Sequence, residues 1–152
     1  MRGGVQLALL LLLAGCGEAV KDDPFAAAVE PEVAAPQPLQ PPAVPVRVGE
    51  MGASFDACNA AGTTRNLGAD AGLQVKAAPF DAAADKGMVP AGARFFICDR
   101  SHDQRWLGVV YNEAGTLDAA CGVSSPVTSG RDYAGPCRSG WVASAFVKLI
   151  AG

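Results

Sequence analysis

Seven prolines between Pro24 and Pro45 limit what this chain of 152 residues can fold into more than any other feature. Proline has no amide hydrogen, so it cannot join the hydrogen-bond ladder of a helix interior or a central strand. We therefore expect residues 16–52 to be a disordered, proline-rich linker and residues 53–152 to form one folded domain. Such segments are stiff, extended spacers; the alternative is a proline-rich recognition motif.

The first fifteen residues have the pattern of an export signal. Arg2 gives a positive start, and a leucine-rich run from Leu7 to Leu13 follows. The apolar stretch is far shorter than the ~20 residues that cross a bilayer as a helix. A charged start, a short apolar core and small residues after it are typical of a secretory signal. Residues 1–15 are therefore predicted to be a signal peptide that is removed.

The end of this signal, Leu13-Ala14-Gly15-Cys16, resembles the lipobox of bacterial lipoproteins. In that family the cysteine is acylated, with palmitate among the lipids, and becomes the first mature residue. The resemblance implies a membrane anchor through Cys16; the alternative is an ordinary signal with an incidental cysteine. Gly17 stands where the retention signal would have Asp. For a Gram-negative host, the resemblance implies the outer membrane, facing the periplasm.

Charge excludes one class of partner. The segment 51–152 has nine acidic and nine basic residues, and the segment 17–50 has six acidic and two basic residues. Affinity for nucleic acid depends on an excess of Lys and Arg that neutralises phosphates. We therefore predict that the protein does not bind nucleic acid.

Five cysteines become an even four once Cys16 is assigned to lipid, and the four are Cys58, Cys98, Cys121 and Cys137. Export places them where disulfides persist, and four cysteines allow three pairings. We favour Cys121–Cys137, which would hold the Gly-, Ser- and Pro-rich stretch 112–136 to the next strand, and hence Cys58–Cys98. The alternatives are free thiols and, less well supported, zinc, since no pair has CxxC spacing and His102 is the only histidine.

Short segments separated by turn residues predict an all-β domain. The predicted strands are Gly72–Ala77, Met88–Gly92, Arg94–Cys98, Arg105–Tyr111, Gly140–Val142 and Phe146–Leu149. The first alternates apolar and polar residues, as a half-buried strand does. The third is rich in aromatic and β-branched residues. Many short strands with Gly-rich turns indicate a small barrel or sandwich.

Five segments together resemble a bacterial SH3-like (Src-homology-3) domain. They are Leu73–Lys76, Met88–Gly92, Phe96–Asp99, Trp106–Tyr111 and Gly140–Ser144, of which the last, Gly-Trp-Val-Ala-Ser, is the most specific. The resemblance implies a small SH3-like β-barrel interrupted by the insertion 112–136. Two positions depart from the family pattern, Lys76 in place of Arg and Ala78 in place of Gly before Pro79.

The sequence contains no recognisable catalytic pattern. Cysteine catalysis needs a thiolate close to a histidine, and His102 lies in a charged turn where exposure to solvent is the simpler interpretation. No P-loop, dinucleotide fingerprint or calcium loop is found. We therefore predict a protein that is not an enzyme and that needs no cofactor and no metal.

With catalysis set aside, a ligand-binding function is predicted, because small barrels use aromatic-lined grooves between their loops to bind ligands. The predicted ligand-binding residues are Phe80, Arg100, Arg105, Trp106 and Tyr111, while Trp141 and Phe146 are expected in the core. Arginine beside an aromatic ring can bind a carboxylate or stack on a ring. The predicted function is a lipid-anchored, non-catalytic module that recognises peptidoglycan peptide or glycan. The alternative is an envelope scaffold lipoprotein that binds another protein through residues 112–136.

Overall fold

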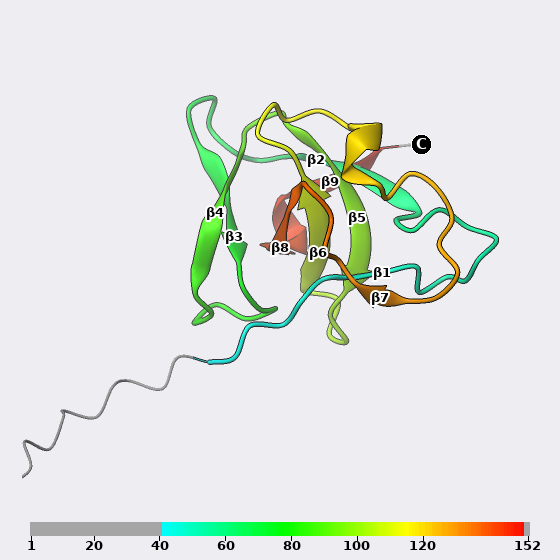
Figure 1. Ribbon diagram of the computed structural model, residues 1–152. Coiled ribbons are helices and arrows are strands. Elements are labelled where there is room, and N and C mark those ends of the chain that lie inside the picture. Colours follow the sequence, from blue (N-terminus) through cyan, green and yellow to red (C-terminus); the bar gives the residue numbers. More distant parts are fainter. Residues whose placement is uncertain (1–40, 151–152) are drawn as a thin grey trace, which may run out of the picture. The chain divides into compact units, whose positions relative to one another are not determined.

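The computed structural model describes residues 41–150, which form an all-β domain (Figure 1). Two 3-10 turns, η1 (Ala119–Cys121) and η2 (Ser144–Phe146), are the only helical elements of these residues. The strands are β1 (Arg47–Val48), β2 (Ala60–Thr64), β3 (Gly72–Lys76), β4 (Asp85–Pro90), β5 (Arg94–Arg100), β6 (Trp106–Tyr111), β7 (Arg131–Asp132), β8 (Arg138–Ala143) and β9 (Val147–Ile150). The predicted all-β class is confirmed. The predicted signal peptide 1–15 and Cys16 lie outside the described residues.

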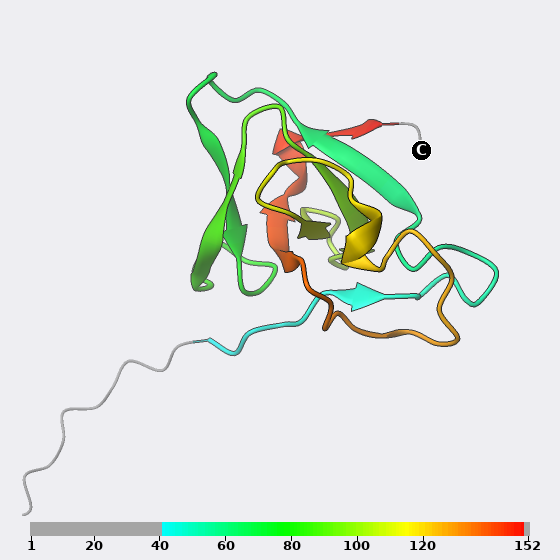
Figure 2. The same cartoon turned by 45° about the horizontal axis from the view of Figure 1, so that its top comes forward.

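Seven strands form one sheet in the order β4-β3-β8-β6-β5-β2-β9, and every pair of neighbours is antiparallel. The sheet is strongly curved, as the two views show (Figures 1 and 2). Strands β1 and β7 form a separate two-stranded ribbon beside β5. Strand β8, which follows the insertion, pairs with β6, which precedes it, so the inserted segment begins and ends at neighbouring strands of the sheet.

The inner face of the curled sheet forms the main core. Successive side chains of a strand point to opposite faces, so each strand contributes alternate residues. The buried cluster includes Leu73, Val75, Val89, Phe95, Ile97, Leu107, Val109, Tyr111, Val142 and Val147. Burying an apolar side chain of this size stabilises the fold by about 1.5–3 kcal/mol.

The insertion forms a second layer on the outer face of β5 and β6. All six residues of β6 are buried, so this strand does not show the alternation of a half-exposed strand. The cluster on its outer face is formed by Val48, Ala57, Cys58, Phe96, Val110, Cys121 and Val123. Residues 112–136 thus cover hydrophobic surface that the sheet would otherwise expose.

Both disulfides hold this outer layer in place. Cys58 is bonded to Cys98, across a sequence separation of 40, and Cys121 to Cys137, across a separation of 16. These are the two predicted pairs. The first joins the segment before β2 to β5, and the second joins η1 to the residue before β8.

The folded part of the chain begins earlier than predicted. Residues up to Gly52 are predicted to be linker, yet Val46 and Val48 are 1% and 2% exposed and belong to the core. After Pro45 the amides are free to donate, and the alternation Val46-Arg47-Val48 gives two buried side chains and one exposed one. The last residues of the predicted linker are therefore a strand of the domain.

Strand β2 was also missed, because its sequence, AAGTT, contains few of the residues that favour strands. The structure explains the small side chains. A Cβ atom at Gly62 would lie 2.9 Å from both Ile97 Cδ1 and Val147 Cγ1. Strand β2 needs small residues here because side chains of the inner core pack directly against its backbone.

Candidate ligand-binding groove

A surface groove runs between β3 and the turn that carries η2, with Trp106 at its centre. One part has a volume of about 280 Å³ and is lined by Leu67, Gly72, Leu73, Gln74, Lys76, Asp81, Trp106, Ala143 and Phe146. A smaller part of about 150 Å³ is lined by Asp81, Arg105, Trp106, Ala143, Ser144 and Ala145. Because the two parts share three residues, we treat them as one site, the Trp106 groove.

A tight turn positions two groove residues, Arg105 just before β6 and Trp106 as its first residue. The Ser101 hydroxyl donates to Asp103 Oδ1 at 2.6 Å and accepts from the Trp106 amide at 3.0 Å. The bond from Ser101 lowers the pKa of Asp103 below its ordinary value, since it stabilises the carboxylate. The turn places the exposed Arg105 at the mouth of the groove, next to the Trp106 ring, which is 7% exposed.

Phe146 lies in the groove, and its predicted place in the core is wrong. The 3-10 turn η2 interrupts the strand alternation after Ala143. As a result Phe146 is 39% exposed, and Val147, at 6%, fills the core instead. Trp141 is 3% exposed, as expected.

Charges of both signs surround the apolar floor. Lys76 Nζ lies 2.7 Å from Asp85 Oδ1, and this hydrogen bond holds the pKa of Asp85 below its ordinary value. Within residues 41–150, Asp81 and Arg105 form no ion pair with a protein side chain. Both are exposed, so the groove offers one carboxylate and one guanidinium to a ligand.

The structure brings together only two of the five predicted ligand-binding residues, Arg105 and Trp106. Tyr111 is 3% exposed within the inner core, where burial raises the pKa of its hydroxyl. Phe80 is half-buried and Arg100 is exposed, and neither lines the groove. Lys76 and Asp81 also line the groove but are not predicted from the sequence. They lie in or just after β3, and only tertiary packing brings this segment close to Trp106.

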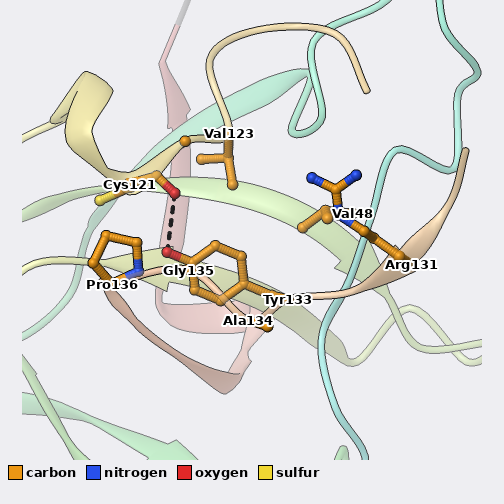
Figure 3. A pocket seen from close by; sticks show the side chains of 9 residues that line it. Val48, Cys121, Val123, Arg131, Tyr133, Ala134, Gly135 and Pro136 are labelled. Atoms are coloured by element: carbon orange, nitrogen blue, oxygen red, sulfur yellow. Dashed lines mark hydrogen bonds between the residues drawn. The ribbon is translucent and has the colours of Figure 1, made fainter. Parts of the chain in front are cut away.

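A second pocket lies in the insertion (Figure 3). It has a volume of about 260 Å³, and Val48, Val123, Arg131 and Tyr133 are among its lining residues. The Tyr133 hydroxyl donates to the Cys121 carbonyl at 3.0 Å, and Figure 3 shows this bond as a dashed line between two residues that line the pocket. Partial burial raises the pKa of Tyr133.

Neither pocket resembles a metal centre. In the described part of the chain, no three His, Cys, Asp or Glu side chains are grouped so that they could hold a metal ion. His102 is exposed in the turn between β5 and β6. None of the helical turns in residues 41–150 is long and apolar enough to cross a membrane. No family model, curated protein or solved structure matches the chain.

Proposed function

We propose that this protein is a lipid-anchored, non-catalytic binding module of the bacterial cell envelope, and that its Trp106 groove recognises peptidoglycan peptide or glycan. The observation that carries the proposal is the groove itself. An open apolar floor formed by Leu67, Trp106 and Phe146 is edged by an unpaired carboxylate and an unpaired guanidinium among the described residues. A concave site that combines apolar walls with a few polar groups is the usual form of a ligand site.

The chemistry of the groove suits the components of a cell wall. Stem peptides of peptidoglycan carry carboxylates, and arginine binds a carboxylate through paired, charge-assisted hydrogen bonds. Arg105 offers such a group at the mouth of the groove. Asp81 offers the opposite charge to an amine on the same ligand. Sugar rings pack against aromatic faces, which Trp106 and Phe146 provide.

The arrangement of the chain supports an anchored module. The lipobox-like end of the signal favours lipid on Cys16 and an outer-membrane location facing the periplasm. The chain from Cys16 to Ala43 has 28 residues, which would reach about 90 Å as an extended polyproline segment. A domain on such a tether can sample the cell wall. The antiparallel sheet, with Gly140-Trp141-Val142 in β8, supports the proposed SH3-like barrel.

A cosedimentation assay tests the proposal. The purified mature chain is expected to sediment with isolated sacculi, and Phe146→Ala should weaken this binding about fivefold or more. Phe55→Ala is the matched control, since Phe55 is 51% exposed and does not line the groove. Arg105→Gln should also weaken binding, whereas Arg94→Gln should not. If the wild-type chain stays in the supernatant, peptidoglycan is not the ligand.

The insertion pocket favours a second candidate, a scaffold lipoprotein that binds another envelope protein through residues 112–136. The pocket is held open by a disulfide and by Tyr133 rather than by a mobile loop. Ala134→Arg would fill the pocket, because exposed Ala134 lines it, and Ala114→Arg is a control in the same insertion. Sacculus binding that survives Ala134→Arg but not Phe146→Ala favours the first function over the second.

A further inference from the structure

Residues Val44–Val48, here called the strap, cross the surface of the sheet as an extended chain. The Val44 amide donates to the Ala77 carbonyl at 2.9 Å. The Val44 carbonyl accepts from Trp141 Nε1 at 2.7 Å. The start of the strap is thus held by its main chain, on one side by the segment after β3 and on the other by β8.

The rest of the strap is bound in the same way. The Val46 carbonyl accepts from the Tyr133 amide at 2.8 Å. The Arg47 amide donates to Asp99 Oδ2 at 3.1 Å. Main-chain groups of three strap residues are therefore satisfied by partners far away in the sequence, and contacts of this kind do not depend on the side chains of the strap.

Two of the valine side chains of the strap are buried, and the third is exposed. Val46 and Val48 are 1% and 2% exposed, while Val44 is 41% exposed. Val46 packs in one cluster with Trp106 and Trp141. A Cβ atom at Gly108 would lie 3.1 Å from Val46 Cγ1, so the missing side chain at Gly108 provides the socket for Val46.

Receptors for extended peptides use the same two kinds of contact. Main-chain hydrogen bonds give affinity, and sockets for alternate side chains give specificity. Pro42 and Pro45 fix backbone angles close to the extended form. The ordering cost on binding is therefore low, as for a preorganised ligand.

We infer that the surface formed by Ala77, Asp99, Trp106, Tyr133 and Trp141 is a binding site for an extended, proline-flanked peptide segment. In the folded chain the strap occupies this site. The same segment of a second copy of this chain can replace it. Trp106 also lines the groove described above, so removal of the strap lengthens that groove toward Trp141. The inference does not rest on peptidoglycan as the ligand of the groove.

The chain offers a place at which the strap can be made a separate molecule. Exposed Met51 lies in the turn between Gly49 and Gly52, both of which have positive φ angles. Neither disulfide crosses this turn. While the turn is intact, the strap competes at an effective concentration on the order of mM, as a ligand on a short linker does. A cut there removes this advantage.

The experiment uses the mature chain with a protease site inserted after Met51. After cleavage, the N-terminal fragment is expected to stay bound at micromolar concentration in size-exclusion chromatography. A peptide of residues 41–51 should then displace it in a concentration-dependent way. Release of a dye-labelled fragment reports the displacement. The two tryptophans of the chain lie in one cluster with Val46, so their fluorescence reports whether the site is empty.

Substituted peptides test which strap residues are read, with no risk to folding of the domain. The Val46→Ser peptide should need at least about tenfold more for displacement, since it loses a buried valine. The Val44→Ser peptide is the matched control and should act like the original. A domain that unfolds on cleavage, a fragment that never exchanges in excess peptide, or equal potency of the two substituted peptides would overturn the inference.

Discussion

The hydroxyl of Tyr133 accepts a 3.0 Å hydrogen bond from the amide of Cys137, a residue that is itself bonded through sulfur to Cys121. The same hydroxyl donates to the Cys121 carbonyl. One side chain therefore joins the two ends that the disulfide also joins. Cys121 and Cys137 are thus connected twice, once by the disulfide and once through the hydrogen bonds of the Tyr133 hydroxyl.

Tyr133→Phe is expected to destabilise the fold by about 1–3 kcal/mol, because the substitution leaves a partly buried amide and carbonyl without their partner. Chemical denaturation followed by tryptophan fluorescence measures this. The disulfide should still form, as peptide mapping without reduction would show. An unchanged denaturation midpoint would mean that water replaces the hydroxyl at no cost.

Removal of the disulfides should cost different amounts. In the chain-entropy model, the free energy lost grows with the loop that the bond closes, at about 3 kcal/mol for Cys121–Cys137 and about 4 kcal/mol for Cys58–Cys98. We therefore expect the double variant Cys58→Ala/Cys98→Ala to have the lower denaturation midpoint. The reverse order would show that local packing, and not loop length, decides the contribution of each bond.

The Lys76–Asp85 pair makes a pH-dependent contribution. Its hydrogen bond lowers the pKa of Asp85 below the ordinary 3.8. The stabilisation is therefore present above the ordinary pKa and is lost as the pH falls through the folded-state pKa. In an NMR titration, Lys76→Met should raise the pKa of Asp85 toward 3.8, while Lys86→Met, outside this pair, should leave it unchanged.

Lipid on Cys16 remains a prediction and has a direct test. Cells that express the wild-type chain should incorporate labelled palmitate into it, and the protein should partition into the detergent phase. Cys16→Ser should lose both properties, since the hydroxyl is not the acceptor of the lipobox pathway. Labelling of the Cys16→Ser variant would contradict the assignment of this cysteine.

Local patterns made much of the sheet predictable. The segments around Val75, Phe95 and Val109 combine β-branched or aromatic residues with strand-like alternation, and each forms a strand of the inner core. The strands β1, β2 and β7 were missed because they are short or contain small residues. They owe their existence to pairing with distant segments, which a local pattern does not record.

The groove was predictable only in part, for a similar reason. Arg105 and Trp106 were found because a cation beside an aromatic residue at the end of a charged turn is a local signal. The sequence predicts Phe146 in the core, because it does not reveal that η2 interrupts the strand. Lys76 and Asp81 reach the groove through the packing of β3 and its following turn against Trp106.

The hydrogen bond between Trp141 and Val44 also has a mechanical consequence. A pull on the N-terminal segment enters the fold at Val44, where the bonds to Ala77 and Trp141 are the first to bear the load. The covalent link at Cys58 lies further along the chain and is reached only after β1 has separated from β7. The strap is held by noncovalent contacts alone, whereas the sheet behind it is cross-linked by a disulfide. Tension would therefore release the strap before it disturbed the seven-stranded sheet.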